Sequence, residues 1–150
     1  MIRNEQPEMN PQSMVEQFHC LFDILVRKAP GQVDERTRVL RERLIQEEFE
    51  ELKEAMGKQD LAAIAKELAD LLYVVYGTAV SYGIDMDPVF REVHRSNMSK
   101  VGGYKREDGK WVKPSTYSPA AIEPILADQQ RPGGQVSESS EAYEEVEPRA

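Results

Sequence analysis

The feature that most constrains the fold is an apolar stretch without a polar face. Nearly every residue from Leu68 to Val80 is apolar, and the stretch lies between Asp60 and Gly83. Asp is a preferred N-cap and Gly a preferred helix stop, so residues 61–82 are predicted to form one helix. A helix that is apolar on almost every side needs partners around it. We therefore expect it to lie at the centre of a helical bundle or in an oligomer interface.

Capping residues predict two helices before this one. Ser13 and Glu16 form a capping box, and the helix that follows them is expected to end before Pro30. Asp34 is the predicted N-cap of a second helix, and Gly57 is its predicted stop. Short connections join these helices, which is typical of an up-and-down arrangement.

The chain beyond Gly83 carries signals of a different kind. Asp87 is followed by a proline and opens a fourth helix, which is expected to reach about Lys100. A tight-turn signal within residues 104–113 predicts a short hairpin or a lariat-like loop, and a last short helix is expected at 119–127. The predicted fold class is therefore all-α: a four-helix up-and-down bundle with a short hairpin or loop extension.

Length and composition predict one domain with two loose ends among the 150 residues. Residues 1–12 are polar and contain prolines, and we expect them to form a flexible N-terminal arm. Residues 13–130 are expected to form the all-α domain. Residues 131–150 are rich in Gly, Ser and Glu, and they are predicted to be a disordered acidic tail.

Charge and cysteine content argue against some classes of function. The net charge of −8 argues against nonspecific nucleic-acid binding, although residues 91–113 are basic. No apolar run reaches the roughly 20 residues of a membrane span. A single cysteine, Cys20, rules out an internal disulfide and predicts a cytoplasmic protein. Cys20 itself is expected to be buried as a small apolar residue.

Acidic residues repeat at helical spacing on the second predicted helix. With Leu44 placed at 0° on an ideal helix, Glu48 lies at about 40° and Glu51 at about −20°. Both angles fall inside the apolar arc of that helix, which faces the expected core. Glu47 lies at the edge of the arc, at about −60°. Two carboxylates therefore point inward from this helix.

The third predicted helix repeats this pattern. Glu67 falls among apolar residues, and Asp70 lies about 60° from it. Buried carboxylates without partners are costly, so a bound cation is expected between the two helices. Neither acidic helix contains His or Cys, which favours Mg²⁺, or Mn²⁺ as a substitute, over Zn²⁺ and over a di-iron centre built on Glu-x-x-His pairs. The predicted metal ligands are Glu48, Glu51, Glu67 and Asp70.

These acidic motifs resemble those of a known family. The pattern EExxE at 47–51, followed by ExxD at 67–70, resembles the signature of the MazG-like nucleoside triphosphate pyrophosphohydrolases. That superfamily includes the all-α dimeric dUTPases, the dCTP pyrophosphatases and the phosphoribosyl-ATP pyrophosphatases, and we place the chain near the first two. The likeness covers roughly residues 13–101.

The resemblance implies a reaction and assigns residues to it. Mg²⁺ held by the four acids bridges the triphosphate, and water attacks the α-phosphorus to give nucleoside monophosphate and pyrophosphate. Glu47 is the implied base or water-orienting group. Asn97 and Lys100 match the family's Asn-x-x-Lys, which contacts nucleotide and phosphate. The leading substrate is dUTP, within a role in clearing unwanted nucleotides from the pool.

Several alternatives are open at this point. Glu50 offers a competing register to Glu47, and a plain surface position explains Glu47 equally well. His19 is interpreted as a structural residue beside the apolar face of the first helix. A different class of function is a helical oligomerisation or adaptor module with an acidic partner-binding face, which predicts that Glu48 and Glu51 are exposed. In either case the apolar third helix predicts a homodimer or a dimer of dimers.

Overall fold

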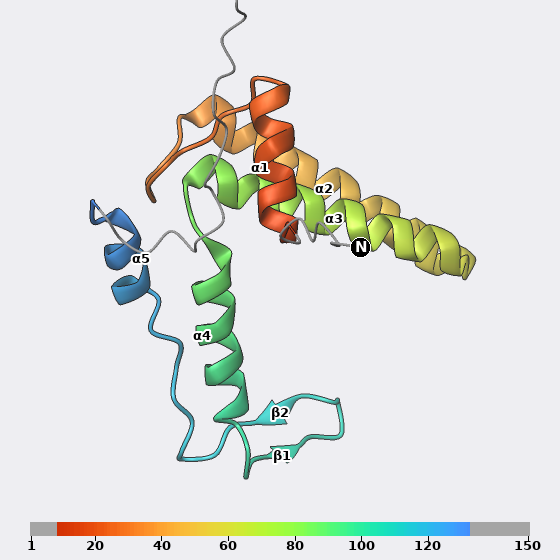
Figure 1. Ribbon diagram of the computed structural model, residues 1–150. Coiled ribbons are helices and arrows are strands. Elements are labelled where there is room, and N and C mark those ends of the chain that lie inside the picture. Colours follow the sequence, from red (N-terminus) through yellow and green to blue (C-terminus); the bar gives the residue numbers. More distant parts are fainter. Residues whose placement is uncertain (1–8, 133–150) are drawn as a thin grey trace, which may run out of the picture.

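The structure is a computed structural model that describes residues 9–132, so most of the predicted arm and tail lies outside the described residues. Residues 9–132 form five helices and one two-stranded hairpin (Figure 1). In chain order these are α1 Pro11–Leu21, α2 Glu35–Lys58, α3 Leu61–Tyr82, α4 Met86–Met98, β1 Tyr104–Lys105, β2 Trp111–Val112 and α5 Glu123–Gln130. The all-α fold class is confirmed.

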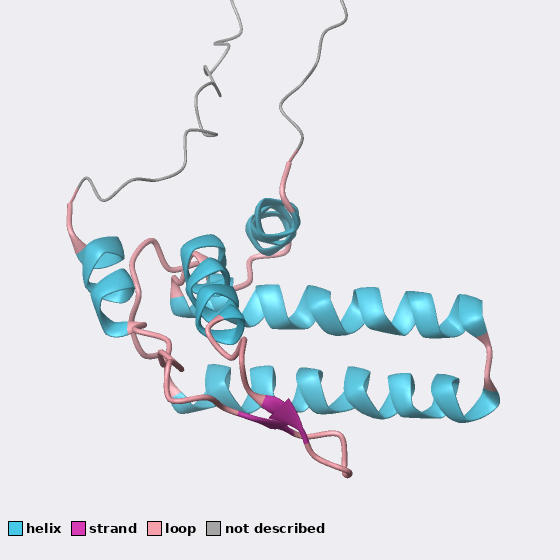
Figure 2. Cartoon of the chain, turned by 90° about the horizontal axis from the view of Figure 1, so that it is seen from below, coloured by secondary structure: helices cyan, strands magenta, loops and turns pink. Residues whose placement is uncertain are grey.

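Helices α2 and α3 lie side by side as an antiparallel pair (Figure 2). Only Gln59 and Asp60 separate them, and Asp60 is the predicted N-cap: its carboxylate accepts a hydrogen bond from the N–H of Ala63 at 3.1 Å. Helix α2 passes the predicted stop at Gly57 and ends at Lys58, because Gln59 adopts the left-handed conformation with φ of 56°. A connection this short places residues at equal distances from it opposite one another.

Helix α1 packs across α3 (Figure 1). The buried apolar side chains come from α1, α2 and α3, and most of them are small. They are Val15, Leu52, Ala55, Ala79 and Val80. The core is therefore modest for a chain of this length.

Four polar side chains are buried within residues 9–132, and two of them, His19 and Arg41, lie beside Gly77. His19 is 2% exposed and its Nδ1 lies 3.1 Å from the backbone oxygen of Leu25, which confirms its interpretation as a structural residue. Burial lowers the pKa of His19. Arg41 donates to the backbone oxygen of Val74 at 2.9 Å. A glycine is needed beside them, since a Cβ at Gly77 would lie 2.4 Å from Arg41 Nη2 and 2.9 Å from His19 Nε2.

Helix α1 begins and ends earlier than its signals predicted. Its N-cap is Asn10 rather than Ser13, and the N–H of Ser13 donates to the Asn10 side chain at 2.8 Å. Pro11 directly follows the cap and suits the first helical position. The helix ends at Leu21, so the segment that leads to Pro30 is a loop rather than helix.

The prediction of a buried cysteine is wrong. Cys20 is exposed. The buried positions of α1 are Val15 and His19, which lie one turn apart and mark the face that meets the core. Cys20 follows His19 and is therefore turned about 100° away from it round the helix.

Helix α4 leaves the other helices and points away from the α2/α3 pair (Figure 1). Its N-cap is Asp85 rather than the predicted Asp87, because the Asp85 carboxylate accepts a hydrogen bond from the N–H of Asp87 at 3.1 Å. The helix ends at Met98, two residues before the predicted end at Lys100. Within residues 9–132, its contacts with the other helices are sparse.

Two glutamine side chains hold the junction between α3 and α4. Gln12 donates to the backbone oxygen of Ile84 at 2.7 Å and accepts from the N–H of Met86 at 2.9 Å. Gln129 pairs in the same way with Asp85, donating to its backbone oxygen and accepting from its N–H, both at 3.0 Å. These amides come from α1 and α5, so both terminal helices help to fix the direction of α4.

The predicted hairpin is confirmed, with Tyr104 opposite Val112 and Lys105 opposite Trp111 in an antiparallel ladder. The chain then returns along α4, and α5 begins at Glu123 rather than at Pro119. The residues in between bind α4 instead of forming a helix: the N–H of Ala121 donates to Glu92 Oε1 at 2.9 Å.

Glu92 makes this return segment sensitive to acid. Its hydrogen bonds with Arg95 and the N–H of Ala121 lower its pKa from 4.5 to about 2. A lowered pKa stabilises the fold above the unfolded-state value, and that stabilisation is lost as pH falls from about 4.5 towards 2. We expect Glu92→Gln to lower the thermal midpoint near neutral pH, and its difference from wild type to shrink on acidification. Thermal melts of wild type and Glu92→Gln, near neutral pH and at acidic pH, measure this. A difference in thermal midpoint that stays constant between the two conditions would contradict it.

Large apolar side chains remain exposed on each of the helices α1 to α4. Those on α3 and α4 that are between 38% and 69% exposed include Leu68, Leu72, Val75, Phe90 and Val93. Apolar surface of this extent is typical of an interface with another chain. Across residues 9–132, no helix combines the length and the apolar character that a membrane crossing requires.

Candidate metal centre

The α2/α3 pair brings the two acidic motifs together. Glu48 on α2 and Asp70 on α3 lie at similar distances from the short connection, as do Glu51 and Glu67. One carboxylate oxygen from each of Glu48, Glu67 and Asp70 lies within 4.8 Å of the other two. We call these three residues the acidic cluster. Glu67 and Asp70 come from successive turns of α3, and Glu48 comes from α2.

The acidic cluster contains a carboxylate oxygen with no partner. The Glu67 side chain is 12% exposed, and its Oε2 is buried without a hydrogen bond from any described residue. Burial raises the pKa of Glu48, and the negative charges of Glu51, Asp70 and Glu67 raise it further. Both observations describe negative charge that the protein itself leaves undercompensated.

One cation of the chain already touches the acidic cluster. Lys66 Nζ lies 2.7 Å from Asp70 Oδ2 and 3.2 Å from Glu67 Oε1. The hydrogen bond to Asp70, followed by the hydrogen bond to Glu67, raises the pKa of Lys66. Sequence reasoning missed Lys66, although its spacing of four residues from Asp70 is the spacing of a helical ion pair. A single ammonium does not balance three carboxylates, so the cluster can accept a further cation.

The other acidic residues of α2 lie outside the acidic cluster. Glu51 is exposed and is not one of its members, although its charge acts on Glu48. Glu47 is exposed, with Oε1 lying 3.7 Å from Arg43 Nε. Glu50 accepts from Lys53 at 2.9 Å on the exposed side of α2. The competing register through Glu50 therefore has no support from the geometry.

Asn97 and Lys100 lie at the far end of α4, apart from the acidic cluster. Lys100 Nζ donates to Asn97 Oδ1 at 2.7 Å. Among residues 9–132, neither side chain forms a hydrogen bond or an ion pair with an acid of the cluster. Helix α4 points away from the α2/α3 pair (Figure 1), so one chain does not unite the two groups of predicted site residues.

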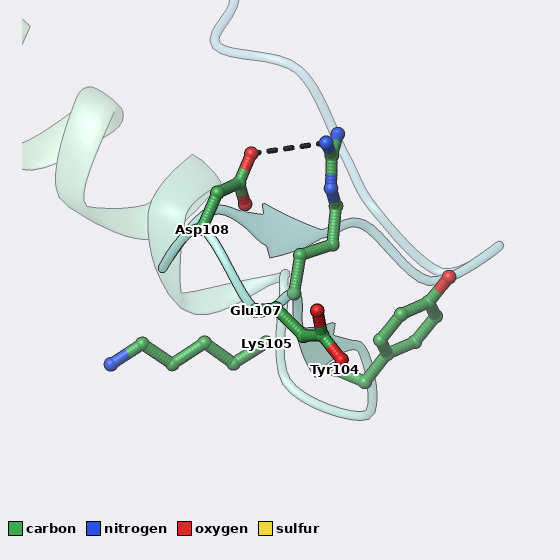
Figure 3. A pocket seen from close by; sticks show the side chains of 5 residues that line it. Tyr104, Lys105, Glu107 and Asp108 are labelled. Carbon is green, nitrogen blue, oxygen red and sulfur yellow. Dashed lines mark ion pairs between the residues drawn. The ribbon is translucent and has the colours of Figure 1, made fainter.

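A separate open hollow of about 510 Å³ lies at the hairpin turn (Figure 3). Its lining comes from residues 104–108 alone. Arg106 and Asp108 pair with each other there at 3.0 Å, so their charges are already balanced. This hollow contains none of the predicted site residues, and we assign no chemistry to it.

The acidic cluster fits a hard divalent cation. All its donor atoms are carboxylate oxygens, and one of them is buried without a partner. Mg²⁺ and Mn²⁺ prefer oxygen ligands of this kind, usually together with water and substrate phosphates. Because the cluster is only partly buried, an approaching substrate has access to an ion held there.

A comparison with known protein families matches the part of the chain that contains the acidic cluster. The family model of phosphoribosyl-ATP pyrophosphohydrolase matches residues 15–97. The match includes both acidic motifs and Asn97, and it ends before Lys100 and the hairpin. No curated protein matches the chain.

Proposed function

Because the chain belongs to the phosphoribosyl-ATP pyrophosphohydrolase family, we propose that it hydrolyses a nucleoside triphosphate at the α-phosphorus with the help of Mg²⁺. The products are nucleoside monophosphate and pyrophosphate. The observation that carries the proposal is the unpartnered oxygen of Glu67 within the acidic cluster, on the two helices that the family match includes.

Each acid has a role in this proposal. Glu48, Glu67 and Asp70 hold Mg²⁺, and Glu51 joins them from the adjacent turn of α2 by a change of side-chain rotamer. Bound Mg²⁺ screens the triphosphate and stabilises the charge that develops during the displacement. Glu47 takes the proton of the attacking water or orients that water, and Arg43 restrains its carboxylate. Mn²⁺ is expected to substitute for Mg²⁺.

We propose dUTP as the leading substrate, with phosphoribosyl-ATP as the second candidate because of the name of the matching family. An aromatic group near the acids supports binding of a base. Tyr73 follows Asp70 by one helical turn, and the Phe18 ring lies 5.6 Å from the Tyr73 ring in an edge-on arrangement. The Phe22 ring lies 4.4 Å from the Phe18 ring and is tilted by 37° relative to it. These rings are partly exposed and offer a surface on which a base can stack.

A homodimer or a dimer of dimers is part of the proposal. The exposed apolar side chains of α3 and α4 need cover, and a second copy of the chain offers the same surface. In such an assembly Asn97 and Lys100 reach the acidic cluster of a neighbouring subunit, where they contact the nucleotide and its phosphates. Sedimentation at several protein concentrations tests this, and a monomer at all of them would contradict it.

The proposed reaction is tested by pyrophosphate release from a panel of nucleotides. The panel contains the common nucleoside and deoxynucleoside triphosphates and phosphoribosyl-ATP, each with Mg²⁺, Mn²⁺ or EDTA. We expect fast pyrophosphate release from one nucleotide of the panel, with dUTP as the leading candidate. No pyrophosphate release is expected with EDTA. If a folded protein that binds Mg²⁺ hydrolyses no nucleotide, the adaptor hypothesis replaces the proposed function.

Lys66 provides a prediction for metal binding. Lys66→Met removes an ammonium that competes for the oxygens of Glu67 and Asp70, so Mg²⁺ affinity should rise by about fivefold, the scale of one exposed ion pair. Lys58→Met is the matched control, because Lys58 pairs with Glu54 at the end of α2. Titration calorimetry on both variants measures the effect. An unchanged affinity in Lys66→Met would show that this lysine does not oppose the metal.

A further inference from the structure

Two lysines gather round one aromatic ring at the end of α4. Lys113 Nζ lies 4.2 Å from the centre of the Tyr117 ring, and Lys100 Nζ lies 6.0 Å from it. Neither ammonium forms an ion pair with a carboxylate of residues 9–132. On the neighbouring turn of α4, by contrast, Arg95 forms an ion pair with Glu92 at 2.8 Å. This end of α4 therefore carries concentrated positive charge.

The hairpin is what brings Lys113 to this place. Trp111 Nε1 donates to the backbone oxygen of Lys100 at 2.8 Å, which ties β2 to the end of α4. The approach is close enough to require Gly103, where a Cβ would lie 2.0 Å from the backbone oxygen of Val112. Lys113 directly follows β2 and is thereby placed beside α4.

The segment that carries the ring between the two lysines is held by backbone hydrogen bonds. The N–H of Tyr117 donates to the backbone oxygen of Pro114 at 3.1 Å. The next residue is tied to α4, since the N–H of Ser118 donates to Ser99 Oγ at 2.8 Å. Tyr117 is thus positioned beside α4, and the negative face of its ring attracts both ammonium groups.

Asn97 adds a hydrogen-bond donor to the same place. Its Oδ1 accepts from Lys100 Nζ at 2.7 Å, so its amide NH₂ is directed to other partners. Asn97 is exposed, and so is Lys113. Two ammonium groups that share one ring repel each other, and an anion bound between them removes that repulsion.

We propose that Lys113, held on Tyr117, forms with Lys100 and Asn97 a binding site for an oligophosphate. The inference rests on the proposed function and deepens it: the segment beyond the family match supplies a second ammonium to the phosphate chain of the nucleotide. A polyphosphate suits the site because it presents several charged oxygens to two separate lysines. Charge-assisted hydrogen bonds of this kind are among the stronger ones in proteins.

The test is pyrophosphate binding by titration calorimetry in EDTA, where metal-mediated binding at the acidic cluster is absent. Lys113→Ala is expected to weaken binding at least about tenfold, the scale of one charge-assisted hydrogen bond. Lys113→Arg should recover most of the loss. The matched control is Lys110→Ala, which removes the same charge from the same hairpin, and it should leave affinity unchanged.

Kinetics with the best nucleotide provide the second readout. Lys113→Ala should raise KM about tenfold and leave kcat within about twofold, because the phosphate chain is bound there and not cleaved. Equal losses in Lys113→Ala and Lys110→Ala, or no loss in either, would overturn the inference while wild-type hydrolysis upholds the proposed function. If the wild type hydrolyses nothing, the proposed function fails, and pyrophosphate binding in EDTA still decides whether the oligophosphate site exists.

Discussion

Glu67→Gln is expected to reduce metal-dependent pyrophosphate release by about two to three orders of magnitude. A bound metal contributes several kcal/mol to a transition state of this kind, and each 1.36 kcal/mol lost is a factor of ten in rate. The Glu67 side chain is only 12% exposed, whereas the Asp70 side chain is 40% exposed. The unpartnered Oε2 of Glu67 is the oxygen most in need of a cation.

The same substitution separates the enzyme from a structural role for Glu67. Glutamine keeps the size of the side chain and removes its charge, so the metal-free protein should be at least as stable as wild type, because repulsion within the acidic cluster falls. Mg²⁺ affinity should drop together with activity. Glu54→Gln is the control, since Glu54 is exposed and paired with Lys58. Full activity in Glu67→Gln, or equal loss in both variants, would contradict the assignment.

Gly83→Ala is expected to destabilise the protein by about 3 kcal/mol. The left-handed conformation at Gly83, with φ of 71°, costs about 1–2 kcal/mol for a residue with a Cβ. That Cβ would also lie 2.2 Å from the backbone oxygen of Ala29, and forced overpacking adds about 1–3 kcal/mol. The clash is with backbone and cannot be relieved by a change of rotamer. Urea denaturation at a fixed protein concentration measures the loss.

Gly57→Ala is the matched control for this prediction. Gly57 lies in the last turn of α2 and a Cβ there would meet nothing within 4 Å. Ala should therefore stabilise the helix by up to about 1 kcal/mol through its lower backbone entropy in the unfolded chain. A similar loss in both variants would show that the close approach of Ala29 to Gly83 does not decide the stability.

Local chemistry made much of the α2/α3 pair predictable. Asp34 and Asp60 cap their helices as expected, and Gly83 ends α3 as predicted. The helical angles also placed Glu48 and Glu67 inside the apolar arcs, and the structure brings them together. Each of these conclusions depends on spacing within one helix or across a two-residue connection, and that information is local.

What depended on contacts between distant segments was not predictable. The direction of α4 is set by Gln12 and Gln129, which contact the junction 72 and 44 residues away along the chain, and no local pattern marks them. Helix α4 begins earlier than predicted, because Asp85 and Asp87 are both good N-caps and tertiary contacts favour Asp85. The meeting of Lys113 with Tyr117 likewise depends on how the hairpin folds back on α4.

The adaptor hypothesis made a prediction that the structure bears on. It required Glu48 and Glu51 to be exposed, and only Glu51 is. Glu48 is half-buried, and burial is the first cause of its raised pKa. A face meant for a basic partner has no need to bury an acid between two helices. Family membership points in the same direction, because the family is one of pyrophosphohydrolases.

The most direct test of the central claim is hydrolysis in ¹⁸O-labelled water with the best nucleotide of the panel and Mg²⁺. Attack at the α-phosphorus places the label in the nucleoside monophosphate and leaves pyrophosphate unlabelled, and mass spectrometry of the two products reads this out. We expect the label in the monophosphate alone, and no products when EDTA replaces Mg²⁺. Label in the pyrophosphate would show attack at the β-phosphorus and contradict the proposed reaction.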